Sequence, residues 1–106
     1  MAKPKPKASE PPPTAPPLTV VSTTKFKREL ERQERRGKDP AKLRAVIELL
    51  RRRLPLEPRH RDHALAGEWR GYRDCHIEPD WLLIYTVKGG ELILARTGTH
   101  ADLFRE

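Results

Sequence analysis

Two apolar runs joined by a pair of glycines constrain the fold of this chain most. Residues 80–88 (DWLLIYTVK) and 91–97 (ELILART) are rich in aliphatic side chains, and Gly89 and Gly90 form the whole connection between them. A two-residue glycine link between such runs is a strong signal for a β-hairpin. The hairpin fixes its own register, which pairs Lys88 with Glu91, Val87 with Leu92, Tyr85 with Leu94 and Leu83 with Arg96.

Both faces of this predicted hairpin carry apolar side chains, so neither is simply a solvent face. Helices can cover only one of the two faces. Because the small Ala95 tolerates the close approach of a helix, we expect the helices on the face that holds Ile84, Ile93 and Ala95. Arg96 is then left on the opposite, open face.

A third strand is predicted immediately before the hairpin. It covers residues 68–77, and a Glu78-Pro79 turn separates it from the next strand. Successive side chains of a strand point to opposite faces, so Tyr72, Asp74 and His76 share one face. A carboxylate and an imidazole therefore lie next but one to each other along this strand.

Strand and helix signals fill the N-terminal half of the chain. Residues 18–23 are mostly β-branched, which predicts a short first strand. Thr23 or Thr24 can cap a helix through Arg36, and Asp39 followed by a proline starts a second helix. The second helix has an apolar stripe made of Leu43, Val46, Ile47 and Leu50. The sequence thus predicts an α+β fold with an N-terminal strand, two helices and a three-stranded antiparallel meander, all strands in one sheet and the helices packed on one face.

The first 17 residues, MAKPKPKASEPPPTAPP, differ in composition from the rest of the chain. They hold most of the prolines and almost no large apolar side chain, so residues 1–17 are predicted to be a disordered tail. Residues 18–106 are predicted to form a single small domain. The single Cys75 excludes an internal disulfide. No apolar stretch approaches the ~18 residues of a membrane span, so we expect a soluble cytoplasmic protein without membrane contact.

Positive charge is concentrated in the helical half. Residues 18–61 carry 14 basic and 6 acidic side chains, net +8, whereas residues 62–106 carry 5 basic and 8 acidic, net −3. A basic half attracts a polyanion, and nucleic acid is the natural candidate; a solvated face is the alternative. The triplet Arg51, Arg52 and Arg53 is most simply explained by a favourable interaction with the negative end of the helix dipole, and docking on RNA is the alternative.

Side chains that can move protons or hold anions gather in the C-terminal half, namely His63, His76, His100, Asp74, Asp80 and Arg96. RNA can be cut by attack of its own 2′-hydroxyl, which needs a base, an acid and donors for the charge on phosphorus. Histidine fits both proton transfers, and Arg96 and Arg73 can hold the phosphate oxygens. His100 is the first choice for a proton-transfer role, because Gly98 allows the chain to turn it inward. Base and acid are not assigned among the histidines.

The order of these residues also resembles a known family. DHALAGEWRGYRDCHIEPDWLLIY followed by ARTGTHADLF is similar to the YafQ-type toxins of bacterial toxin-antitoxin modules, within the RelE family of messenger-RNA interferases. The resemblance implies a RelE-like fold, cleavage of mRNA in the ribosomal A site without a metal, inhibition of translation, and neutralisation by a small antitoxin of the DNA-binding repressor type. The matched functional positions are His63, His76, Asp80, Trp81, Arg96, His100 and Phe104, with Asp74 a weaker match in role.

Several of these residues also have simpler interpretations. Trp81 and Phe104 can stack on a base, but an aromatic residue on a strand more often belongs to the core. Cys75 alternates away from its neighbours, which favours a small buried hydrophobe over a nucleophile. His60, in the segment RHRDH, is most simply a solvated loop residue.

A metal site and a non-enzymatic role are the broader alternatives. Three imidazoles and two carboxylates could bind zinc, but their spacing is irregular and Arg96 would repel a cation. We therefore predict no metal and no cofactor. A second function class is a non-catalytic module that binds RNA or the ribosome on the same scaffold.

Overall fold

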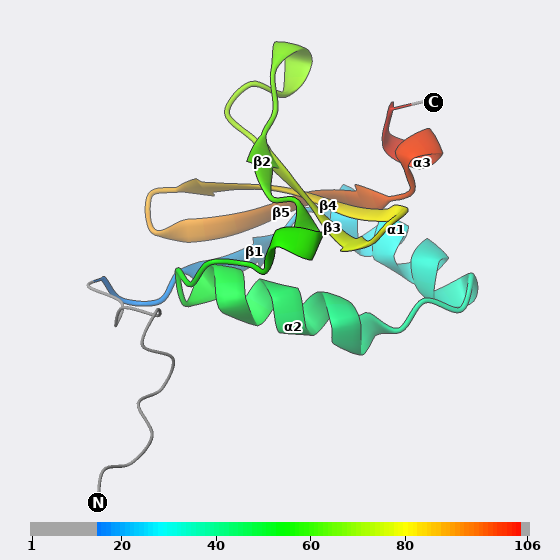
Figure 1. The fold of residues 1–106 in the computed structure, drawn as a ribbon, viewed down its shortest axis with the longest axis horizontal. Coiled ribbons are helices and arrows are strands. Elements are labelled where there is room, and N and C mark those ends of the chain that lie inside the picture. Colours follow the sequence, from blue (N-terminus) through cyan, green and yellow to red (C-terminus); the bar gives the residue numbers. More distant parts are fainter. Residues whose placement is uncertain (1–14, 105–106) are drawn as a thin grey trace, which may run out of the picture.

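One five-stranded mixed sheet organises the part of the chain that the structure describes (Figure 1). The computed structural model describes residues 15–104, so most of the predicted disordered tail lies outside the described residues. In chain order the elements are β1 (Thr19–Ser22), α1 (Thr24–Arg35), α2 (Pro40–Arg51), η1 (Pro58–His60), β2 (His63–Ala64), η2 (Gly67–Trp69), β3 (Arg73–Glu78), β4 (Trp81–Lys88), β5 (Glu91–Gly98) and α3 (His100–Phe104). The strand order is β1-β5-β4-β3-β2, with β1 parallel to β5 and the other pairs antiparallel. The predicted α+β class is confirmed.

The N-termini of the two long helices are set by the residues that the sequence indicated. The Thr23 hydroxyl accepts a hydrogen bond from the Phe26 backbone N–H at 3.0 Å, and the Asp39 carboxylate accepts one from the Ala41 N–H at 2.9 Å. Each side chain satisfies a backbone donor that has no partner inside the helix. Pro40 is the first residue of α2, where a missing N–H costs nothing. The predicted starts of both helices are therefore confirmed.

The hairpin register is confirmed only near the Gly-Gly turn. Lys88 lies opposite Glu91 and Tyr85 opposite Leu94, as predicted, but the register shifts between Ile84 and Tyr85. Beyond this β-bulge Ile84 lies opposite Arg96, and the predicted pairing of Leu83 with Arg96 is wrong. A bulge places two residues of one strand against one residue of its partner, and a periodic pattern contains no sign of it.

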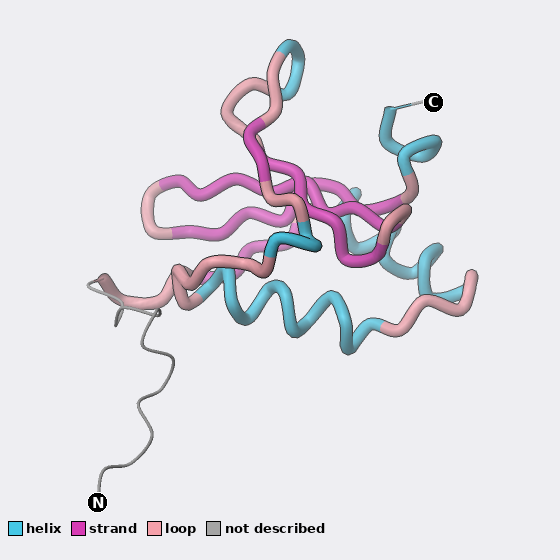
Figure 2. The backbone as a smooth tube through the Cα atoms, in the orientation of Figure 1, coloured by secondary structure: helices cyan, strands magenta, loops and turns pink. Residues whose placement is uncertain are grey.

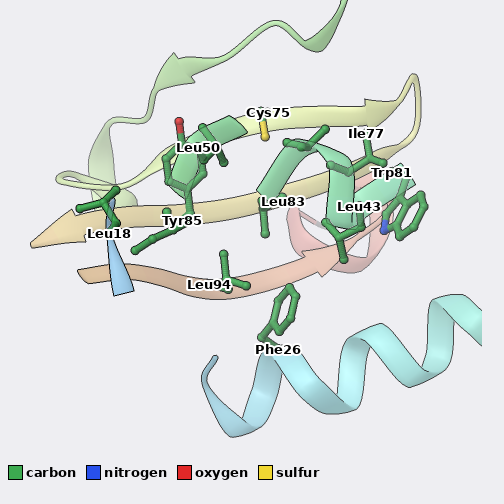
Figure 3. Packing of buried hydrophobic residues seen from close by; sticks show 12 residues of the cluster. Leu18, Phe26, Leu43, Leu50, Cys75, Ile77, Trp81, Leu83, Tyr85 and Leu94 are labelled. Carbon is green, nitrogen blue, oxygen red and sulfur yellow. The ribbon is translucent and has the colours of Figure 1, made fainter. Parts of the chain in front are cut away.

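The predicted placement of the helices on the sheet is also wrong. α1 and α2 pack on the face opposite to Ile84 and Ala95, where the three central strands supply a larger set of apolar side chains (Figure 3). The core on this face consists of Leu18, Phe26, Leu43, Val46, Leu50, Cys75, Ile77, Trp81, Leu83, Tyr85, Leu92 and Leu94. Burying the larger apolar surface stabilises the fold more than a close approach to one alanine.

The second face of the sheet carries a smaller apolar cluster. Leu82, Ile84, Ala95 and Leu103 form it, and Leu65, Trp69, Tyr72 and Phe104 pack against it. These residues come from β4, β5, α3 and the β2–β3 connection. In Figure 2 that connection and α3 lie on one side of the sheet, and α1 and α2 lie on the other. The sheet is thus covered by long helices on one face and only partly covered on the other.

The strand predicted over residues 68–77 begins later than expected. β3 starts at Arg73, and residues 67–69 form the short helix η2 instead. Gly67 and Gly71 have positive φ angles of 66° and 93°, which turn the chain before β3 and are unfavourable for other residues. The two-residue strand β2, which pairs with β3, was not predicted. Two residues are too few for an alternating pattern to be seen.

Within residues 15–104, the structure contains no helix that is long and apolar enough to span a membrane.

A buried hydrogen-bond chain in the core gives a first prediction. The Trp81 indole N–H donates to the Thr97 hydroxyl at 2.9 Å, and this hydroxyl donates to the Leu82 carbonyl at 2.7 Å. Thr97→Val keeps the shape but leaves both groups unpaired, so we expect it to lower the free energy of unfolding by about 1–3 kcal/mol in urea denaturation. Thr86→Val is the matched control, because the Thr86 hydroxyl bonds the Gly71 carbonyl at an exposed position where water can replace it. Equal losses for the two variants would contradict this expectation.

Candidate active site

The sheet face that lacks α1 and α2 gathers most of the predicted site residues in one row. The strand registers place His63 opposite Asp74, Asp74 opposite Ile84, and Ile84 opposite Arg96. Residues directly opposite each other on neighbouring strands project to the same face. His76 lies two residues after Asp74 and opposite Leu82, so the predicted shared face of Asp74 and His76 agrees with the register. The β-bulge is what brings Arg96 into this row.

His100 is held by Asp80 at one end of the row. The His100 backbone N–H donates to Asp80 Oδ1 at 2.8 Å, and His100 Nδ1 lies 2.6 Å from the same oxygen. These hydrogen bonds hold the pKa of the Asp80 carboxyl below its ordinary value. With Nδ1 bound to the carboxylate, Nε2 is the nitrogen of His100 that is left for proton transfer.

His76 lies beside His100 and is more buried than an ordinary surface histidine. The two ring centroids are 5.4 Å apart. Burial lowers the pKa of His76, and the opposing effect of the nearby Asp74 is smaller. The lowered pKa favours the neutral imidazole, which is the form that accepts a proton.

Asp74 is the buried carboxylate of the site, with only 4% of its surface exposed. Its Oδ2 lies 3.8 Å from His63 Nε2, and its Oδ1 has no hydrogen-bond partner among the described residues. Burial raises the pKa of Asp74, and the nearby imidazoles of His63, His76 and His100 partly offset that rise. His63 is oriented from its other side, because its Nδ1 lies 2.7 Å from the Arg61 carbonyl oxygen.

Arg96 is tied to helix α1 by Glu29, which the sequence analysis did not consider. Arg96 Nε lies 2.9 and 2.8 Å from the two carboxylate oxygens of Glu29, and Nη2 lies 2.6 Å from one of them. The same carboxylate accepts a hydrogen bond from the Thr97 N–H at 3.1 Å. Glu29 thus holds the Arg96 guanidinium in place through Nε and Nη2. Nη1 of Arg96 takes no part in these contacts. In the sequence Glu29 is one of many charges on α1, and nothing there distinguishes it.

The turn that carries His100 is fixed by Asp102. The carboxylate of Asp102 accepts hydrogen bonds from the Thr99 N–H at 2.9 Å and from Arg36 at 2.8 Å, and the Asp102 N–H donates to the Thr99 hydroxyl at 3.0 Å. The contact with Arg36 holds the pKa of Asp102 well below its usual range. A side chain at Gly98 would come within 2.9 Å of Asp102, so glycine is required there for close packing. α1 therefore positions His100 as well as Arg96.

Two predicted site residues lie elsewhere. Trp81 is fully buried in the core on the helix side, so its alternative core role fits the structure and stacking on a base does not. Arg73 lies opposite Tyr85, whose side chain is also in that core, and it bonds Asp62 at 3.1 Å. Arg73 is adjacent to Asp74 in β3, so the two side chains project to opposite faces. The register therefore places Arg73 on the face opposite to Asp74, and its role at the site stays a prediction.

Phe104 lines a shallow cavity that the sequence analysis did not find. The cavity measures about 410 Å³ and is bordered by Leu65, Ala66, Glu68, Trp69, Leu103 and Phe104. Trp69 packs edge to face against Tyr72, with ring centroids 5.3 Å apart. Phe104 at the cavity and His100 at the site are the two ends of the same short helix, α3. Trp69 was missed because the sequence placed it inside a regular strand.

The interpretation of His60 as a solvated residue is wrong. Only 7% of its surface is exposed, and its Nδ1 lies 2.6 Å from the His76 carbonyl oxygen. The short helix η1 turns this side chain toward the sheet, which the polar segment RHRDH does not suggest. Cys75, in contrast, is fully buried as predicted, and burial raises the pKa of its thiol.

The arginine triplet begins at Arg51, the last residue of α2. Arg51 bonds Glu48 at 2.8 Å, and Arg53 donates from Nε to the Pro16 carbonyl at 3.0 Å. These contacts do not distinguish docking on RNA from an interaction with the helix dipole, so both interpretations of the triplet stay predictions. In the part of the chain that the structure describes, no group of three histidine, cysteine or acidic side chains is arranged to hold a metal ion.

The five-stranded α+β fold of this chain is shared with solved bacterial toxins. A copper-bound mutant toxin from Helicobacter pylori superposes with a TM-score of 0.80 at 42% identity, covering 82% of this chain and 99% of that chain. The DinJ-YafQ toxin-antitoxin complex of Escherichia coli gives a TM-score of 0.76 at 41% identity, covering 82% of this chain and 97% of that chain. The fold is therefore that of a small bacterial toxin.

Sequence comparison identifies the family. Residues 18–105 match the family described as bacterial toxin of type II toxin-antitoxin system, YafQ. The Escherichia coli protein named mRNA interferase toxin YafQ is 45% identical over 80 residues, which cover 74% of this chain and 87% of that protein. The chain belongs to the YafQ family of type II toxins, so the predicted resemblance is confirmed.

The ion pair between Asp102 and Arg36 gives a prediction for the pH dependence of stability. Because the pKa of Asp102 is lower in the folded state than in the unfolded state, its stabilisation is present above the unfolded pKa, about 3.9, and is lost as the pH falls through the folded pKa. We expect Asp102→Asn to lower the free energy of unfolding near pH 7, with the difference from wild type shrinking below about pH 4. Glu91→Gln removes the same charge from an exposed position and serves as the control. A difference that stays constant with pH would contradict this role of Asp102.

Proposed function

We propose that this protein is an endoribonuclease toxin that cleaves mRNA, as the name of its Escherichia coli relative describes. The observation that carries the proposal is the row of site residues on the helix-free face. Three imidazoles, two carboxylates and one guanidinium lie on or beside that face, while the residues between them are apolar. Such a set can move protons and hold an anionic phosphate without hydrolytic water.

The reaction begins at the 2′-hydroxyl of the RNA. A base takes the hydroxyl proton, the 2′-oxygen bonds to the adjacent phosphorus, and the bond from phosphorus to the 5′-oxygen breaks. An acid donates a proton to that leaving oxygen, which gives a 2′,3′-cyclic phosphate and a 5′-hydroxyl. Each positioned proton transfer contributes about 100- to 10,000-fold to the rate.

His76 and His100 have environments suited to opposite roles. Burial lowers the pKa of His76, which supports the neutral form and hence the base. His100 has a carboxylate 2.6 Å from Nδ1, which orients the ring and leaves Nε2 for proton transfer, and we assign His100 as the acid. The 5.4 Å between the two ring centroids allows both to reach one phosphodiester.

The remaining site residues bind and orient the RNA. Arg96 donates to the phosphate oxygens on which negative charge develops, with Glu29 holding its guanidinium in position. Asp74 is buried and acts through the more exposed His63, whose Nε2 lies 3.8 Å from Asp74 Oδ2. Phe104 stacks on a base at the cavity that Trp69 also borders.

The proposed partners are the ribosome with its mRNA and a cognate antitoxin. The Escherichia coli relative was solved in complex with the antitoxin DinJ, which supports a small antitoxin for this chain. The net charge of +8 over residues 18–61 supports docking of the helices on ribosomal RNA, which would place the site at mRNA in the A site.

A non-catalytic module that binds RNA is the second candidate. One observation favours it. Arg96 already makes three contacts to Glu29, so fewer of its donors are left for the phosphate of a reacting RNA. Intact message with retained ribosome binding would support the module. A cleaved message with a 5′-hydroxyl fragment would support the enzyme.

Growth measurements test the toxin class directly. We expect inducible expression of the chain to arrest growth, and co-expression of the neighbouring open reading frame to restore it. Growth that continues under full expression of folded protein would contradict a toxin role.

Product mapping with two variants tests the proposed acid. We expect His100→Ala to lower the cleavage rate by about 100- to 10,000-fold, because one proton transfer is lost. Asp80→Asn alone should lower the rate less than His100→Ala does. Added to His100→Ala, it should lower the rate no further, because Asp80 acts through that imidazole. Wild-type cleavage by His100→Ala, or additive effects of the two changes, would contradict these roles.

Ribosome binding across a salt series tests docking by the arginine triplet. Replacing Arg51, Arg52 and Arg53 with glutamine should weaken binding and reduce the slope of log K against log salt by about 2 to 3, if each arginine neutralises one phosphate. Replacing Lys25, Lys27 and Arg28 on α1, all exposed, removes the same charge and is the matched control. Equal effects for both triple variants would show only a general charge effect and would contradict a specific docking role.

A further inference from the structure

His60 lies behind the helix-free face, on the side of the sheet that the helices cover. It ends η1 and lines a cavity of about 590 Å³ between α2 and β3, together with Val46, Leu49 and Ile77. Only 7% of the residue is exposed, and its Nδ1 lies 2.6 Å from the carbonyl oxygen of His76. A carbonyl can only accept, so Nδ1 carries the proton and donates it across this short distance.

The ring of His76 makes no hydrogen bond to any described residue that would fix its orientation. Its Nδ1 is buried without a partner, in contrast to His100 and His63, whose Nδ1 atoms are bonded to Asp80 and to the Arg61 carbonyl. The position of the His76 ring therefore depends on the position of its own backbone. A group that holds this backbone therefore also holds the point from which the ring projects.

The backbone of β3 is irregular at this point. His76 lies opposite Leu82 and Glu78 lies opposite Trp81, so Ile77 is an extra residue and the register shifts beside His76. Strand pairing defines the chain less tightly at a bulge than in a regular ladder. The hydrogen bond from His60 is made at this irregular step, by a side chain that lies beside the helix-side residues Val46 and Ile77.

We propose that His60 is a positioning residue for His76, holding the carbonyl of residue 76 so that its imidazole stays beside His100. This inference rests on the proposed function, in which His76 takes the 2′-hydroxyl proton. His60 does not touch the RNA itself, because the sheet separates it from the site. A shift of His76 by about 1 Å would lower the rate by up to about 100-fold, which is the usual sensitivity of proton transfer to geometry.

A pair of amide substitutions separates the hydrogen bond from the bulk of the ring. In His60→Asn the side-chain amide nitrogen takes the place of Nδ1 and can donate to the same carbonyl. In His60→Gln the amide lies one carbon further out, near the place of Nε2, and the adjoining cavity gives it room. Both variants are polar and of similar size, so a loss of stability from the missing ring is common to both.

The first readout is the steady-state cleavage rate. We expect His60→Gln to lower kcat by about 10- to 100-fold with little change in KM, and His60→Asn to keep most of the wild-type kcat. A kcat that is unchanged in His60→Gln, or lowered equally in both variants, would overturn the proposal.

The second readout is the titration of the His76 imidazole by NMR, which needs no RNA. Asp74, His63, His100 and Arg61 surround this ring, and burial is the largest cause of its lowered pKa. If the ring loosens and becomes more exposed in His60→Gln, its pKa should rise toward the ordinary value, while His60→Asn keeps the wild-type titration. A wild-type titration of His76 in His60→Gln would overturn the positioning role. Wild-type protein that fails to cleave RNA would reject the proposed function instead, and the NMR comparison would still decide the role of His60.

Discussion

The packing of α1 and α2 on one face of the sheet is the constraint on which the rest of the structure depends. β3 and β4 alternate so that Cys75 and Leu83 face the helices, and the neighbouring residues then face the other way. Asp74 and His76 are among those neighbours, and the bulge in β5 brings Arg96 to the same face. The site is therefore a consequence of core formation, since the burial of one set of side chains fixes where the other set projects.

Carboxylates then set the positions of the side chains that face outward. Asp80 orients His100, Glu29 holds Arg96, and Asp102 joins the turn before α3 to Arg36. Two of these three links run to α1 or to Arg36, its C-cap, so the helix that contributes little to the apolar core determines the geometry of the site. The dense charge of α1 therefore has a structural role as well as any role in binding RNA.

Local signals in the sequence predicted the helices and the hairpin, whereas the placement of their faces could not be predicted. Thr23, Asp39 and the Gly89-Gly90 turn act on residues close to them in the chain, and each was read correctly. The helix-covered face was assigned wrongly, because it depends on the total apolar area of three strands, and the bulge beside Ala95 left no trace in the pattern. The histidines were found by residue type and family resemblance, but Glu29 and His60 become visible only when segments far apart in the sequence meet.

The most direct measurement is NMR mapping of the surface bound by a short RNA whose scissile nucleotide lacks the 2′-hydroxyl, so that it binds without being cut. The account predicts that the largest shifts fall on the imidazoles of His63, His76 and His100 and on Phe104, all on or beside the helix-free face. Shifts confined to α1 and α2, with the imidazole signals unchanged, would contradict the claim that this face of the sheet is where RNA is bound and cleaved.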